Sequence, residues 1–262
     1  MYEKKEAKLA KGSLAYYVAG KGRPILYIHS GTGVRMTDPL ETLAKTFTVH
    51  MPILPGFEGT PEIDGVSDTR SLAELLIEFA DKMSSEKWDV MGHSIGGAVA
   101  AWIAILAPDR VDQLILTAPG GFQPKDAPPM PSDPKKMLAA AYAHPEKIKP
   151  DDRTPEVAAK NREMAMKYSG GKTRDETLLG KVGEIKALTL ILQGEQDGII
   201  ADGAVQNLRA SIPRSHLIYL YDAAHVPEVD QPERFSRVVG DFLTRGEAFI
   251  VNWGNQPVPV DA

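Results

Sequence analysis

The sequence of 262 residues contains no cysteine. That absence excludes disulfides, a thiol nucleophile and metal sites built from thiolates. No apolar run is long enough to cross a membrane, and the first residues lead into no apolar core of a signal peptide. We therefore expect a cytoplasmic protein without a membrane partner.

The chain also has no excess of positive charge. Its 30 Lys and Arg residues stand against 35 Asp and Glu residues, for a formal net charge of −5. Without a large basic block, nucleic acid is a poor candidate partner. The histidines include no His-x-x-x-His or His-Glu-x-x-His pair, so we expect no metal site. An apolar fraction of 43% suits one globular domain with an insertion.

One short motif organises the rest of the chain. Gly92-His93-Ser94-Ile95-Gly96 lies between Trp88–Met91, which reads as a strand, and an alanine-rich run to Leu106, which reads as a buried helix. This context fits Gly-x-Ser-x-Gly, a sharp turn that lifts a serine hydroxyl above a sheet. The N–H of Ile95 would then point where an oxyanion forms. The motif alone is common, so its meaning depends on finding a base, an acid and a second oxyanion donor.

Strands and helices alternate along the chain. Apolar runs predict strands at 13–19, 24–29, 46–54, 88–91, 113–118, 188–192 and 216–221, and helical spacing predicts helices at 38–45, 71–83, 201–211 and 235–243. This pattern indicates an α/β fold with a mostly parallel central sheet covered by helices on both faces. Ligands of such sheets bind beyond the carboxyl ends of the strands.

Residues 123–185 interrupt this alternation. They are rich in proline, lysine and acidic residues, with helical stretches near 134–143 and 155–168 and no strand pattern. We interpret them as an inserted helical cap or lid, with residues 1–122 and 186–262 forming the core domain. Its methionines and aromatics would either line an acyl pocket or hold the cap together (Met130, Met137, Tyr142, Met164, Met166 and Tyr168).

Three further loops follow predicted strands. His29-Ser30-Gly31-Thr32-Gly33 leaves backbone N–H groups free, as a second oxyanion donor requires, although a flexible turn would look the same. Asp197 comes just beyond a strand and could orient a histidine, with Glu195 as its nearest competitor. His225 follows the last strand in a short loop, so it should lie at the same edge as Ser94.

Together these residues resemble the α/β-hydrolase superfamily across nearly the whole chain. Five segments are similar to its His-Gly-Gly-Pro-Gly loop, its Pro-Gly-x-Gly turn with one residue added, its Gly-x-x-Asp acid turn, its Gly-His-x-Pro motif and its x-Pro-Glu-x-Phe motif: 29–33, 55–59, 194–197, 224–227 and 231–235. Ser30, Thr32 and Ala224 depart from the usual residues. The chain order Ser, Asp, His is the one this fold uses.

The resemblance implies a catalytic triad of Ser94, Asp197 and His225, with N–H groups of Gly31 and Ile95 as the oxyanion hole and no cofactor. Residues that we expect near the substrate are Ser30, His93, Met137, Tyr142 and Val226. The partner would be a small-molecule substrate, and the protein a monomer or a homodimer. We also expect Phe249–Trp253 to pack on the body or on a neighbour.

The leading functional hypothesis is a serine hydrolase that cleaves a small or medium carboxylic ester through an acyl-enzyme on Ser94. A carbon–carbon bond hydrolase of a vinylogous diketone acid is the alternative, because Leu114–Phe122 is similar to the cap entrance of that family. Against it, His93 replaces the usual asparagine and Val226 the usual tryptophan. A lactonase, a perhydrolase and a receptor that binds its ligand without turnover also remain open. The serine nucleophile disfavours the dehalogenase and epoxide-hydrolase branches, which attack with an aspartate.

Overall fold

The centre of the computed structural model, which describes residues 2–249, is an eight-stranded sheet. In spatial order its strands are β1 (Glu3–Leu9), β2 (Gly12–Gly20), β4 (Thr48–Pro52), β3 (Pro24–Ile28), β5 (Trp88–His93), β6 (Val111–Thr117), β7 (Leu188–Gly194) and β8 (Ser215–Leu220). Strand β2 pairs antiparallel with both β1 and β4, and all pairs from β4 to β8 are parallel. The prediction of an α/β fold with a mostly parallel sheet is confirmed.

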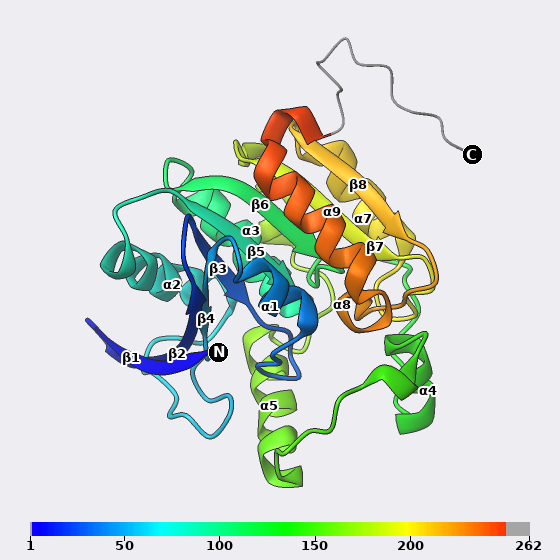
Figure 1. Ribbon diagram of the computed structural model, residues 1–262. Helices are drawn as coiled ribbons and strands as arrows, with labels where there is room; N and C mark the ends of the chain where they lie inside the picture. The colour runs from blue at the N-terminus through cyan, green and yellow to red at the C-terminus, as the bar shows by residue number, and fades with distance from the viewer. Residues whose placement is uncertain (1, 250–262) are drawn as a thin grey trace.

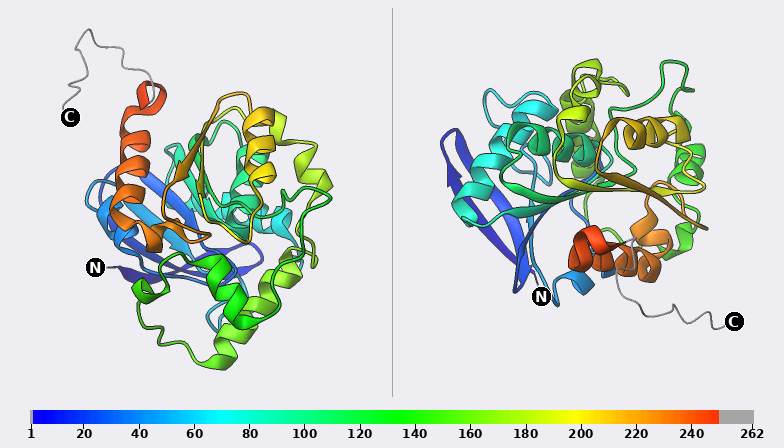
Figure 2. Two further views of the ribbon diagram at one scale, coloured as in Figure 1. Left: turned by 90° about the vertical axis from the view of Figure 1, so that its right-hand side faces the viewer. Right: turned by 90° about the horizontal axis from the view of Figure 1, so that it is seen from above.

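Helices cover both faces of this sheet (Figures 1 and 2). Helices α2 (Thr69–Met83), α3 (Ile95–Leu106) and α7 (Asp202–Ser211) pack on one face, whereas α1 (Asp38–Leu43) and α9 (Pro232–Arg245) pack on the other. A one-turn helix, α8 (Pro227–Asp230), immediately precedes α9. Each face therefore has its own apolar cluster, and the edge at the carboxyl ends of the strands is left for loops.

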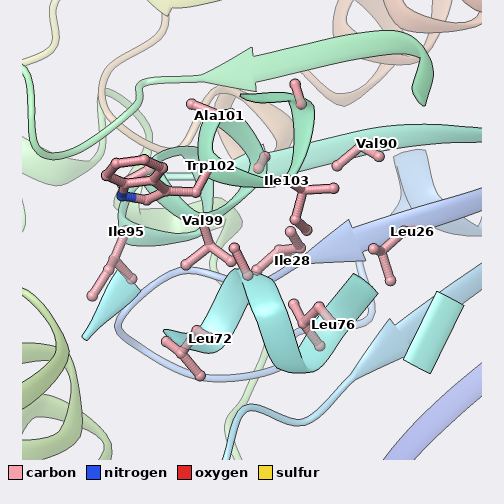
Figure 3. Close-up of a cluster of buried hydrophobic side chains, with 14 of the residues drawn as sticks. Leu26, Ile28, Leu72, Leu76, Val90, Ile95, Val99, Ala101, Trp102 and Ile103 are labelled. Carbon is pink, nitrogen blue, oxygen red and sulfur yellow. The ribbon is translucent and has the colours of Figure 1, made fainter. Parts of the chain in front are cut away.

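The cluster under α2 and α3 fixes the helix that follows Ser94. Leu72 and Leu76 of α2 belong to one cluster with Val99 of α3 and Ile28 of β3, and all four side chains are fully buried (Figure 3). Each such side chain contributes about 1.5–3 kcal/mol relative to an exposed position. Helix α3 is thus anchored along its length, and the serine at its N-terminus is held with it.

The predicted cap segment, residues 123–185, connects β6 to β7, and we call it the insertion. It contains α4 (Pro134–Ala141), α5 (Pro155–Tyr168) and α6 (Glu176–Leu179), with 3-10 turns at Pro145–Lys147 and Val182–Glu184. Helices α4 and α5 match the two predicted helical stretches and lie beyond one end of the sheet (Figure 1). Met164 and Tyr168 are buried, whereas Met130 and Met166 are exposed, so the latter two line no enclosed pocket.

Strand β1 was missed by the sequence analysis for a physical reason. Its residues Glu-Lys-Lys-Glu-Ala-Lys-Leu are mostly charged, and only Ala7 and Leu9 are buried, because it pairs on one side only. At the other end of the chain, a 3-10 turn at Gly246–Phe249 brings the ring of Phe249 to 5.4 Å from that of Phe242. The rest of the apolar stretch to Trp253 lies outside the described residues. Between residues 2 and 249, we find no helix with the length and apolar character needed to cross a membrane.

Candidate active site

Ser94 occupies a strained turn between β5 and α3. Its φ of 55° and ψ of −120° lie in a backbone region that residues other than glycine rarely adopt. A Cβ on Gly92 would lie 2.1 Å from the carbonyl oxygen of Gly96, and a Cβ on Gly96 would lie 2.3 Å from that of Ile28. Glycine is therefore required at both positions, which is the physical basis of the motif.

Asp197 and His225 meet at the same edge of the sheet. Nδ1 of His225 lies 3.0 Å from Oδ2 of Asp197, and the two side chains are 8% and 1% exposed. The other carboxylate oxygen accepts the N–H groups of Ile199 and Ile200, and Oδ2 also accepts Nε2–H of Gln193. Four donors thus hold the carboxylate in one orientation, and among residues 2–249 we find no protein group bonded to Nε2 of the imidazole.

The loop between β8 and α8, residues 221–226, carries His225, and we call it the histidine loop. The N–H of Ala224 donates to the carboxylate of Asp230 at 2.8 Å, and the N–H of Val226 donates to the carbonyl of Ala141 in α4 at 3.1 Å. A Cβ on Gly194 would lie 2.0 Å from the carbonyl oxygen of Ala224, so β7 approaches this loop as only glycine permits. His225 is therefore fixed on several sides.

His93 connects the turn at Ser94 to the histidine loop. Its Nε2 lies 2.9 Å from the carbonyl oxygen of His225, and its Nδ1 lies 3.0 Å from Oε1 of Glu228. The ring centroids of His93 and His225 are 5.1 Å apart. Since His93 is only 3% exposed and both its ring nitrogens face protein groups, neither nitrogen is left for a substrate.

The glycine loop, residues 29–33, follows β3 and borders the same edge. A Cβ on Gly31 would lie 4.0 Å from Cγ2 of Ile95, so the two predicted oxyanion donors are neighbours. Within residues 2–249, neither of their N–H groups is bonded to another protein group. His29 closes the loop: Nε2 accepts the N–H of Leu54, and Nδ1 donates to the carbonyl of Ser30. Burial lowers the pKa of His29 to about 4, so this ring is neutral at pH 7.

A polar network joins the glycine loop to α5 of the insertion. Oε1 of Glu58 accepts the N–H of Val34 at 3.1 Å, Nη1–H of Arg153 at 2.9 Å and Nδ2–H of Asn161 at 2.9 Å. Asn161 is fully buried, and its Oδ1 accepts the N–H of Glu58 in return. Both Arg153 and Asn161 also donate to the carbonyl of Thr32. The insertion is therefore attached to the loop that carries Gly31.

The sequence did not single out Glu58, Arg153, Asn161, Glu228 or Asp230. One signal existed for Glu58: the segment Pro55-Gly56-Phe57-Glu58-Gly59 has one residue more than the Pro-Gly-x-Gly turn that it resembles. In the structure Glu58 has a φ of 52° in this turn. The other four had no local signal, because their partners come from distant parts of the chain.

The remaining predicted pocket residues surround this edge at different depths. Ser30 bonds its hydroxyl to that of Thr32 at 2.9 Å. Tyr142 is the residue after α4, and burial raises its pKa, an effect that the charge of Arg35 opposes and that of Glu228 adds to. Met137 is half-buried on α4, and Val226 is 8% exposed. Among the described residues we find no group of three or more His, Asp or Glu side chains placed to hold a metal ion.

The alpha/beta hydrolase family model matches residues 25–238, from β3 into α9. The chain belongs to the alpha/beta hydrolase family. The match includes Ser94, Asp197 and His225 together with the whole insertion.

Similar proteins of this family carry different activities. The 2-hydroxy-6-oxo-6-phenylhexa-2,4-dienoate hydrolase of Burkholderia cepacia is 25% identical, over 87% of this chain and 90% of that protein. The pimeloyl-[acyl-carrier protein] methyl ester esterase of Yersinia enterocolitica is 25% identical, over 78% of this chain and 85% of that protein. A solved serine hydrolase involved in carbazole degradation shares the fold, with a TM-score of 0.76 at 20% identity over 93% of this chain and 99% of that one.

Proposed function

We propose that this alpha/beta hydrolase cleaves a small or medium carboxylic ester through an acyl-enzyme on Ser94. The observation that carries the proposal is the 3.0 Å contact between His225 and Asp197, on a loop that is bonded to His93, the residue before a serine in a strained turn. An imidazole whose Nδ1–H is held by a carboxylate presents a basic Nε2, and it can take the proton of a serine hydroxyl. A similar protein named as a methyl ester esterase agrees with this chemistry.

The reaction would proceed in two balanced halves. Oγ of Ser94 attacks the ester carbonyl carbon while His225 takes its proton, and the N–H groups of Gly31 and Ile95 stabilise the oxyanion. Collapse of the intermediate breaks the ester C–O bond, and the leaving alcohol takes the proton from His225. Water then attacks the acyl carbon and gives a proton to His225, and the acyl–Oγ bond breaks to release the acid while Oγ of Ser94 takes that proton back from His225. No cofactor enters either half.

The insertion would act as the cap over this site. Its α4 end contacts the loops of Asp197 and His225, and α5 contacts the glycine loop, so a substrate at Ser94 would lie between them. Met137, Tyr142 and Val226 are the residues that we propose as contacts for the acyl or alcohol group.

A carbon–carbon bond hydrolase is the second candidate. Its support is the group of dienoate hydrolases among the similar proteins, of which the Burkholderia cepacia enzyme matches 87% of this chain. The contacts of His93 weigh against this reading, since both its ring nitrogens face protein groups at the position where that family usually has asparagine.

The test compares wild type, Ser94→Ala and the distant control Ser236→Ala on p-nitrophenyl esters of graded acyl length and on a dienone acid. We expect multiple turnovers of short esters, lost about 10⁴-fold or more in Ser94→Ala and unchanged in the control. Faster turnover of the dienone acid than of any ester would favour the second candidate. Ester turnover that survives Ser94→Ala would refute the nucleophile, and binding without any turnover would favour a receptor.

A further inference from the structure

Three consecutive residues of the histidine loop are each held by a different part of the molecule. The N–H of Ala224 is bound by Asp230 and the N–H of Val226 by α4. Between them, the carbonyl of His225 is bound by Nε2 of His93 at 2.9 Å. Only this last bond comes from the turn that carries Ser94, so it is a direct link between the proposed nucleophile and base.

The protons of His93 follow from its neighbours. A backbone carbonyl only accepts, so Nε2 of His93 carries a hydrogen that it donates to His225. Nδ1, at 3.0 Å from Oε1 of Glu228, then either carries a second hydrogen or accepts one from a protonated carboxyl. The first arrangement is an imidazolium facing a carboxylate, and the second is a neutral pair.

The surroundings favour the charged arrangement. Burial lowers the pKa of His93, but the charge of Glu228 and the bond to it outweigh that effect and leave the pKa raised. Burial raises the pKa of Glu228, and the field of His93 outweighs it in the same way, so that pKa is lowered. Two other groups change these pKa values in the same directions: Asp197 raises the pKa of His93, and His225 lowers the pKa of Glu228. The charge of Glu228 in turn raises the pKa values of Tyr27 and Tyr142.

We propose that His93 and Glu228 form a buried ion pair that positions His225 against Ser94. The charged Nε2–H makes a stronger bond to the His225 carbonyl than a neutral ring would. Because His93 is bonded covalently to Ser94, the path from nucleophile to base contains a single hydrogen bond. His93 and Glu228 are positioning residues in this scheme, since His93 contacts the carbonyl of His225 and Glu228 contacts His93.

The inference rests on the proposed function for its effect on catalysis, but the charge state can be measured without a substrate. The ¹⁵N shifts of the imidazole rings, recorded near pH 8, report which nitrogens carry hydrogen. We expect both nitrogens of His93 to be protonated, whereas His50 and His216, whose pKa values are lowered mainly by burial, serve as neutral references in the same spectrum. A single unprotonated nitrogen on His93 would overturn the ion pair.

Glu228→Gln separates charge from shape. The glutamine amide can donate to Nδ1 of a neutral His93, whose Nε2–H still reaches the carbonyl, so the fold should survive while the ¹⁵N spectrum shows a neutral ring. We expect kcat, measured per titrated active site, to fall about 10- to 100-fold. KM should stay within about twofold of the wild-type value, because the pair does not contact the substrate. Glu146→Gln is the matched control, since it removes the carboxylate of an exposed pair with His144 at 3.2 Å and should leave kcat unchanged.

His93→Gln and the double variant complete the experiment. If the two residues act as one unit, the double variant should lose no more activity than the worse single variant. Wild-type kcat in Glu228→Gln, with Ser94-dependent turnover intact, would refute the positioning role alone. Ester turnover by Ser94→Ala as fast as by wild type would refute the proposed function instead, and the ¹⁵N result would still stand.

Discussion

Asp230→Asn is the substitution that most directly tests how the insertion is attached to the histidine loop. The Asp230 side chain is fully buried, and its Oδ2 accepts the N–H groups of Ala224 at 2.8 Å and Ala143 at 3.1 Å. Its Oδ1 accepts the N–H of His144 at 2.9 Å. One carboxylate therefore joins the residue before His225 to the chain that leaves α4.

The expected cost follows from these three bonds. An asparagine can place its oxygen where Oδ2 lies and keep two bonds, although both become neutral and weaker. Its NH₂ group then faces the N–H of His144, which loses a bond to a charged group worth about 1.5–3 kcal/mol. With the weakening of the other two, we expect a loss of about 2–4 kcal/mol in the free energy of unfolding. At about 2–4 °C per kcal/mol for a chain of this size, Tm should fall by about 5–15 °C.

Urea and thermal unfolding followed by circular dichroism measure this loss. Asp241→Asn is the matched control, because that carboxylate lies on the surface of α9, 3.0 Å from Nη1 of Arg245. An exposed pair of this kind contributes about 0.5 kcal/mol or less. Limited proteolysis supplies a second readout, since residues 142–147 should be cut faster only in Asp230→Asn. Equal stability of the two variants, within about 0.5 kcal/mol, would refute this account of Asp230.

Three further predictions concern other parts of the structure. Gly96→Ala should prevent stable folding, because its Cβ would lie 2.3 Å from a backbone oxygen of β3, whereas Gly240→Ala, in open space on α9, should raise the free energy of unfolding by about 0.5–1 kcal/mol in urea titrations. His29 and His50, whose pKa values burial lowers from 6.5 to about 4, stay neutral in the fold but charge in the unfolded chain. Stability should therefore be complete above about pH 6.5 and fall toward pH 4, by about 1.4 kcal/mol per pH unit for the fully buried His29, with a smaller slope in His50→Gln. Asp197→Asn should lower kcat about 10⁴-fold in the protein that folds, and full activity would refute its proposed role.

The parts of the site that were predictable from sequence are those fixed by local contacts. The glycines at 92 and 96 face backbone atoms of the turn itself or of the adjacent strand, so their spacing records the turn directly. The positions of Asp197 and His225 after strands were equally readable, because parallel strands bring their carboxyl ends to one edge. In each case the signal lies within a few residues of the element that it describes.

The parts that were not predictable depend on partners far away in the chain. Glu58 and Arg153 are 95 residues apart, and no spacing rule joins a turn after β4 to the start of α5. His93 was predicted to lie near the substrate, and its contact with Glu228 had no sequence signal because the two residues are far apart in the chain.

The contacts of the insertion limit how it could move as a lid. At the end of α4, the carbonyls of Ala140 and Ala141 accept the N–H groups of Gly198 and Val226, the residues that directly follow Asp197 and His225. On α5, Asn161 donates to the glycine loop. A rigid lift of the whole insertion would break its bonds to all three loops at once. Opening that keeps these bonds must therefore come from the segments of the insertion that lie between the attachments.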